Sequence, residues 1–168
     1  MIELGQIKKG LVVAGETAEE LIESTLAHLS TDNSLTRKSI KSSFASLTIG
    51  SGAVGMVLGD RRQHDTGRLL LGGACRAHTS QNDLCKGGKA GIQGTLMTTD
   101  SEELLKQGVA AAALTWQDFK KVMGDDALKI DHFFCHQVGK AHAQLLFNTL
   151  NLDAARNFET LSQLGNVG

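Results

Sequence analysis

The segment Asp131–Gln137 (DHFFCHQ) combines two histidines with a cysteine, residue types that serve as general bases, nucleophiles and metal ligands. It is a short apolar run that closes in His136-Gln137 and leads through Val138 into a glycine. Ligands of α/β proteins bind beyond the carboxyl ends of strands, and His136 would lie at such an end. The alternative, which these residues taken alone favour, is a histidine hydrogen-bonded within the core.

Side-chain alternation along a strand separates the residues of this segment. His132 and His136 fall on one face, whereas Phe133 and Cys135 fall on the other. Cys135 is therefore poorly placed to be a nucleophile activated by its neighbour His136.

A zinc site is the second possibility for this region, built from His132, His136, His142 and a cysteine. Zinc ligands must converge from one side, and the alternation scatters them. We accordingly expect no metal and no cofactor.

A glycine-rich string, Gly50-Ser51-Gly52-Ala53-Val54-Gly55, matches the pattern G-x-G-x-x-G of dinucleotide-binding folds. That motif needs a helix directly after it to present its amino terminus to pyrophosphate. The residues that follow, Met56-Val57-Leu58, are typical of a strand instead. A structural glycine turn is the favoured interpretation, and a nicotinamide-binding oxidoreductase is the weakest of the functions considered.

The elements that must position these residues follow from hydrophobic periodicity and capping signals. Two helices are predicted by capping boxes, Thr17 with Glu20 and Thr99 with Glu102, the second helix running to about Met123. A third is predicted over 139–150. Strands are expected at 9–15, buried on both faces, as a pair meeting at a glycine turn within 44–58, and at 67–78, 130–135 and 158–161. Loops are expected over 31–43 and 79–94.

Alternating strands and helices predict an α/β layered fold with much parallel sheet. Hydrophobic residues make up 41% of the 168 residues and charged residues 21%, as in ordinary globular domains.

Seventeen Lys+Arg against eighteen Asp+Glu give a net charge of -1, so nucleic acid is not an expected partner. Neither a leader nor an eighteen-residue apolar run is present in this sequence, which predicts a cytoplasmic protein without a membrane span. The three cysteines are expected to be free thiols.

His136-Gln137, followed about thirty residues later by Gly165-Asn166, resembles the paired His-Gln and Gly-Asn motifs of the 3-oxoacyl-(acyl carrier protein) synthase III family of condensing enzymes. Upstream, KGLVVAGE resembles the family strand that follows the nucleophile helix, and LTIGSGAVGMVLGD resembles its glycine-rich hairpin. The helix predicted to end near Met123 falls where the family places its long helix. The whole chain is similar to the carboxy-terminal part of such an enzyme.

This resemblance implies a fold and a chemistry. The fold would be a partial thiolase-like layered fold, α/β/α with a mixed sheet, in which residues 1–95 end the amino-terminal half and residues 96–168 begin the carboxy-terminal half. His136 and Asn166 would be the catalytic donors that hold a carbonyl oxygen during a decarboxylative Claisen condensation in fatty acid biosynthesis. The partners would be acyl carrier protein or acyl-CoA thioesters, and the intact enzyme would be a homodimer.

Departures from the family pattern set limits on this expectation. No residue matches the family's nucleophilic cysteine, so the isolated chain is expected to be a fragment that forms no acyl-enzyme. His136-Gln137-Val138-Gly139 replaces His-Gln-Ala-Asn, and Gly165-Asn166-Val167-Gly168 replaces Gly-Asn-Thr-Ser. These variants are closer to relatives that join two long acyl chains in olefin or other hydrocarbon pathways. A non-catalytic fragment that pairs with an intact synthase is the alternative from another class of function.

Overall fold

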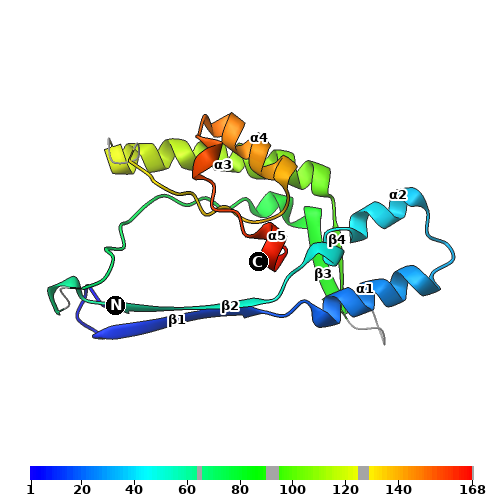
Figure 1. Ribbon diagram of the computed structural model, residues 1–168, viewed down its shortest axis with the longest axis horizontal. Helices are drawn as coiled ribbons and strands as arrows, with labels where there is room; N and C mark the ends of the chain where they lie inside the picture. Colours follow the sequence, from blue (N-terminus) through cyan, green and yellow to red (C-terminus); the bar gives the residue numbers. More distant parts are fainter. Residues whose placement is uncertain (64–65, 90–94, 125–128, 168) are drawn as a thin grey trace.

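The computed structural model describes residues 1–63, 66–89, 95–124 and 129–167. Figure 1 shows α3 and α4 side by side along one side of the molecule, with the β1–β2 ribbon along the opposite side and the carboxyl end between them. The described strands are β1 (Lys9–Glu16), β2 (Gly52–Gly59), β3 (Cys85–Lys89) and β4 (Thr95–Thr99). The described α-helices are α1 (Glu19–Thr31), α2 (Arg37–Ile40), α3 (Ser101–Met123), α4 (Lys140–Leu150) and α5 (Leu161–Leu164).

The β1–β2 ribbon pairs two strands antiparallel, from Lys9 opposite Gly59 to Glu16 opposite Gly52. The predicted strand at 9–15 is confirmed, but its expected burial on both faces is wrong within this chain. Val13 is 66% exposed on one face, and Val12, which alternation places on the other face, is 55% exposed. Both faces of the ribbon therefore present apolar side chains that the described residues do not cover.

The amino terminus of α1 is held by a residue far along the chain. The backbone N–H of Ala18 donates to Ser51 Oγ at 3.0 Å, and the N-cap position has no side-chain hydrogen bond of its own. The predicted capping box of Thr17 and Glu20 is therefore wrong, although the helix is present. Ser51, on the segment that leads into β2, accepts from a different N–H, that of Ala18, from the one that Thr17 was expected to satisfy.

Several extended or loop segments differ from expectation. The predicted loop at 31–43 contains α2, which begins with a reciprocal capping pair between Thr36 and Ser39. The predicted pair of strands within 44–58 is a 3₁₀ turn followed by β2 alone, and 67–78 forms no strand. The predicted loop at 79–94 carries a 3₁₀ helix and β3 in its described part, with residues 90–94 outside the described residues. Strand pairing depends on neighbours that a local pattern does not reveal.

The long helix α3 is confirmed, with its amino end one residue later than the capping box predicts. Asp100, and not Thr99, is the N-cap, and its carboxylate accepts from the Glu103 backbone N–H at 3.1 Å. The predicted helix at 139–150 is α4, which packs on α3. Phe147 of α4 is 1% exposed and is the largest fully buried side chain among the described residues.

An aromatic cluster joins these helices to the segment that carries the histidines. The Trp116 ring stacks on Phe119 with centroids 5.4 Å apart and meets Phe133 edge-on at 6.1 Å. Phe133 in turn meets Phe147 edge-on at 5.6 Å. Phe133 thus anchors the 130–135 segment to α3 and α4.

The strands expected at 130–135 and 158–161 are not formed. The two segments touch through one isolated parallel bridge between Phe133 and Asn157, and α5 begins at Leu161. Much parallel sheet was expected, but the named strand pairs are antiparallel, and parallel pairing is confined to isolated bridges in the described part. Side-chain alternation is nevertheless preserved, because His132 and Phe134 contact Phe158 while Phe133 points toward the helices.

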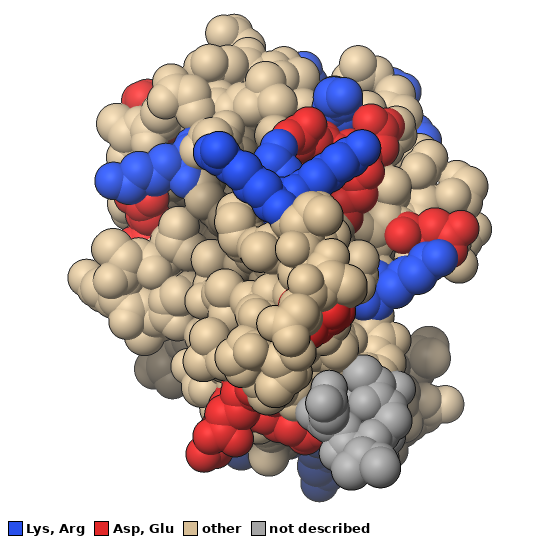
Figure 2. Space-filling model, turned by 90° about the vertical axis from the view of Figure 1, so that its right-hand side faces the viewer, with Lys and Arg blue, Asp and Glu red and all other residues tan. Residues whose placement is uncertain are grey.

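Charges are mixed on the face that carries α1 and α2. Figure 2 shows basic and acidic side chains next to one another there. Lys41 of the 3₁₀ turn after α2 and Glu102 form an exposed ion pair with an N–O distance of 3.3 Å. No described helix is both long enough and apolar enough to cross a membrane.

Candidate functional site

His136 is an exposed residue directly after the anchored 130–135 segment, and the residues on either side of it are half-buried. Its backbone carbonyl accepts from Val138 N–H at 3.2 Å, so the chain turns at this point. Gly139, with φ of 151°, is the residue before α4, and Lys140 begins the helix. The histidine is therefore presented at the junction between an extended segment and a helix, where its imidazole is free of the core. The alternative of a histidine hydrogen-bonded within the core therefore does not fit His136.

His142, in the first turn of α4, lies close enough to His136 for their charges to interact. Burial, with a smaller contribution from repulsion by His136, lowers the pKa of His142 below its ordinary value.

Cys135 has the opposite environment from that of a reactive thiol. Burial raises the pKa of Cys135 above its usual value, which keeps the thiol protonated near neutral pH. Its side chain is half-buried, whereas that of His136 is exposed. Cys135 is thus a packing residue in this arrangement, and Cys75, Cys85 and Cys135 are all free thiols.

Asn166, the second predicted site residue, lies near the carboxyl end of the chain and is fixed by its backbone. Its N–H donates to Thr48 O at 2.8 Å and its carbonyl accepts from Gly50 N–H at 2.9 Å, which makes a parallel bridge beside Ile49. The residue is only 6% exposed. Its Oδ1 is buried and has no hydrogen-bond partner among the residues that the structure describes.

Two glycines make this close approach possible. A Cβ on Gly50 would lie 1.8 Å from the carbonyl oxygen of Leu164, and Gly165 has φ of 74° with Gly50 Cα 3.2 Å from where its Cβ would be. The glycine at position 50 is therefore required for backbone crossing and not for a dinucleotide. The G-x-G-x-x-G string runs directly into β2, so no helix follows it.

Gln137 connects the His136 segment to the segment that leads to Asn166. Its Nε2 donates to Cys135 O at 2.8 Å and to Phe158 O at 3.3 Å. Its Oε1 accepts from the backbone N–H groups of Thr160 at 3.1 Å and Leu161 at 3.3 Å. The sequence drew attention to Gln137 only as half of a motif. A sequence signal for this role is a carboxamide side chain that faces the protein interior, directly next to a histidine that faces outward.

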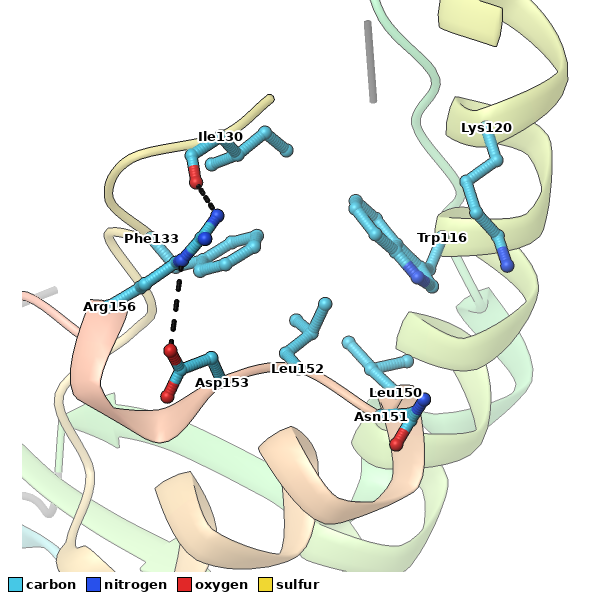
Figure 3. Close-up of a pocket in the computed structure, with 9 residues that line it drawn as sticks. All are labelled: Trp116, Lys120, Ile130, Phe133, Leu150, Asn151, Leu152, Asp153 and Arg156. Atoms are coloured by element: carbon cyan, nitrogen blue, oxygen red, sulfur yellow. Dashed lines mark hydrogen bonds and ion pairs between the residues drawn. The ribbon is translucent and has the colours of Figure 1, made fainter. Parts of the chain in front are cut away.

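The hollow in Figure 3 lies elsewhere, between α3 and the segments 130–133 and 150–156, with a volume of about 310 Å³. Its cationic groups already have partners. Arg156 pairs with Asp153 and donates to the Ile130 carbonyl, and Lys120 lies over the Trp116 ring. The described residues include no group of three or more His, Cys, Asp or Glu side chains arranged to hold a metal ion.

Comparison with solved structures defines the class of fold. The chain has the layered α/β fold of the thiolase-like condensing enzymes, as a partial, carboxy-terminal portion of that duplicated architecture. It superposes on a variant of Xanthomonas campestris OleA with bound lauric acid and lauroyl-CoA, at a TM-score of 0.89 and 32% identity, covering 100% of this chain and 48% of that one. Cerulenin-bound OleA gives a TM-score of 0.90 at the same identity, covering 47% of that chain.

The sequence relatives carry a more specific name. The chain is 34% identical over 178 residues to acyl-CoA:acyl-CoA alkyltransferase of Shewanella oneidensis, covering 99% of this chain and 49% of that protein. It is 32% identical over 168 residues to the alkyltransferase of Xanthomonas campestris, covering 48% of that protein. The chain spans about half the length of the curated relatives it matches. No family model matches it.

These relatives refine the expected resemblance. The prediction of a partial thiolase-like fold is confirmed. The relatives are alkyltransferases that share that fold, and they are not specifically synthase III enzymes, so the olefin or hydrocarbon alternative fits them better than fatty acid biosynthesis does.

Proposed function

We propose that this chain is the carboxy-terminal part of an acyl-CoA condensing enzyme, in which His136 and Asn166 donate hydrogen bonds to the carbonyl oxygen of one acyl thioester. The single observation that carries the proposal is the link through Gln137, which ties the exposed histidine to the segment ending at the buried asparagine. The similarity to two acyl-CoA:acyl-CoA alkyltransferases over the whole chain supports the substrate class.

The proposed chemistry joins two acyl thioesters. A cysteine thiolate, which no residue of this chain matches, takes the first acyl group and releases coenzyme A. A general base takes a proton from the α carbon of the second thioester, and N–H donors from His136 and Asn166 stabilise the enolate oxygen that forms. The α carbon then attacks the acyl-enzyme carbonyl, so that a carbon–carbon bond forms, the carbon–sulfur bond to cysteine breaks and a 3-oxoacyl thioester is released.

The buried Oδ1 of Asn166 is consistent with this role. Asn166 is only 6% exposed, so its carboxamide is held among neighbouring groups, and its Nδ2 carries the N–H donors that the role requires. The imidazole of His136, exposed beyond the anchored segment, is accessible to a ligand. A pair of preorganised donors of this kind stabilises the enolate charge far more than water does, because the donors need no reorganisation during the reaction.

Decarboxylative condensation on acyl carrier protein, as in the synthase III family, is the second form of the same proposal. It uses the same two donors, but carbon dioxide leaves in place of the proton. The Val138-Gly139 pair after His136-Gln137 favours the alkyltransferase form, as does the similarity to two acyl-CoA:acyl-CoA alkyltransferases. A non-catalytic role in pairing with an intact synthase is favoured by one observation, the exposed apolar faces of the β1–β2 ribbon.

The experiment is a chimera in which this chain replaces the matching segment of Xanthomonas campestris OleA. Lauroyl-CoA is supplied, coenzyme A release is followed with a thiol reagent, and the condensation product is measured by mass spectrometry. We expect His136→Ala and Asn166→Ala each to lower condensation by about 10²-fold or more, since each removes a donor to the oxyanion. A folded chimera that forms product equally well after both substitutions would contradict the proposal, and a folded, inactive chimera would favour the non-catalytic role.

A further inference from the structure

Gln137 uses its whole hydrogen-bonding capacity on backbone groups of other segments. A carboxamide has two N–H donors and two oxygen lone pairs, and the four contacts with Cys135, Phe158, Thr160 and Leu161 occupy all of them. Three of these partners lie 21 to 24 residues further along the chain. The side chain therefore fixes tertiary geometry as well as its own local turn.

The two partners of Gln137 Oε1 begin the stretch of chain that leads to Asn166. Thr160 is the residue before α5 and Leu161 is the first residue within it, so Gln137 Oε1 satisfies two N–H groups that the short helix leaves without an internal partner. Asn166 lies five positions after Leu161 along the chain. The far end of this stretch is fixed by the bonds of Asn166 to Thr48 and Gly50.

We call the four hydrogen bonds of the Gln137 side chain the clamp. Its donor side constrains the backbone at His136. Nε2 of Gln137 donates to the carbonyl of Cys135, the residue directly before His136, and Gln137 itself follows the histidine. The backbone on both sides of His136 is thus held by one side chain. Because Gln137 is half-buried and His136 is exposed, the clamp leaves the imidazole accessible.

We infer that Gln137 is a positioning residue, which sets the separation and relative orientation of the His136 imidazole and the Asn166 carboxamide. This inference rests on the proposed function, and it adds a residue that does not touch substrate. Twin donors to one oxygen must be held to within a fraction of an ångström, and a misplacement of about 1 Å can cost on the order of 10²-fold in rate.

The primary test is Gln137→Met in the chimera, which keeps the length of the side chain and removes all four hydrogen bonds. We expect kcat for lauroyl-CoA condensation to fall by about tenfold or more while KM changes by less than about threefold, because binding elsewhere on the substrate is retained. The matched control is Gln163→Met, an exposed glutamine of α5. Its kcat should stay within about twofold of the parent.

A rescue variant separates positioning from simple destabilisation. Gln137→Glu keeps the acceptors for Thr160 and Leu161 but places a carboxylate against the carbonyl oxygens of Cys135 and Phe158, a repulsion that raises the pKa of the introduced acid. Protonation restores one donor, so its kcat relative to the parent at the same pH should rise as the pH is lowered. Gln137→Met and Gln163→Glu should show no such recovery.

The outcomes are separable. If His136→Ala abolishes condensation while Gln137→Met has the parental kcat, the clamp is overturned and the proposed function stands. If His136→Ala has no effect, the proposed function fails. The clamp is then judged in this chain alone by nuclear magnetic resonance, where Gln137→Met must shift the Asn166 side-chain amide signals and Gln163→Met must not. Unchanged Asn166 signals would overturn the inference.

Discussion

At the crossing of Gly50 and Gly165, two backbone segments touch with no room for a side chain between them. The carbonyl of Leu164 lies where a Cβ on Gly50 would be, and Gly165 takes a backbone conformation that favours glycine. Asn166 follows directly, so the position of its carboxamide depends on this crossing. Glycine is required here by backbone packing and not by flexibility.

Gly50→Ala should destabilise the protein by at least about 2 kcal/mol, because the added methyl group meets a backbone carbonyl that cannot rotate away. Urea unfolding of the chain measures the change in the free energy of unfolding. The control is Gly55→Ala in β2, where no heavy atom lies within 4 Å of the new Cβ, and a change of less than about 0.5 kcal/mol is expected. Equal effects of the two substitutions would show that the crossing is not tight.

The candidate residues were predictable from the sequence to different degrees. His136 and Asn166 were named from a resemblance that joins two short motifs, and they remain predictions as catalytic donors. The contacts of Gln137 were not predictable, because three of its four partners lie more than twenty residues away and are backbone groups, which carry no sequence signature. Thr17 illustrates the same limit, since the distant Ser51 holds the start of α1.

At the scale of elements, α3 and α4 form the framework that carries the histidine segment. Phe133 extends from that segment into the helices and contacts both Trp116 and Phe147. These helices were predictable because their apolar periodicity and end signals are local. The runs at 130–135 and 158–161 were mistaken for strands because an apolar run becomes a strand only where a neighbour pairs with it.

Phe147→Ala should cost about 3–5 kcal/mol of stability, because Phe147 is fully buried between α3 and the histidine segment. Phe134→Ala is the matched control, since Phe134 is 74% exposed and should lose less than about 1 kcal/mol. Thermal unfolding monitored by circular dichroism distinguishes the two. A larger loss for Phe134 would mean that the segment is anchored on its outer face.

At the scale of the whole molecule, the chain has the fold of about half of a thiolase-like enzyme. The β1–β2 ribbon exposes apolar side chains on both faces, as at Leu11 and Val54, which a layered fold covers with further elements. The α/β class was predictable from the alternation of elements, whereas the extent of parallel pairing was not. The division into residues 1–95 and 96–168 stays a prediction.

The most direct measurement is a crystal structure of the chimera with lauroyl-CoA bound. We expect the thioester carbonyl oxygen to lie about 2.7–3.2 Å from both a ring nitrogen of His136 and Nδ2 of Asn166. This expectation would be contradicted by a structure in which these two side chains point to opposite sides of the Gln137 clamp and no single oxygen reaches both.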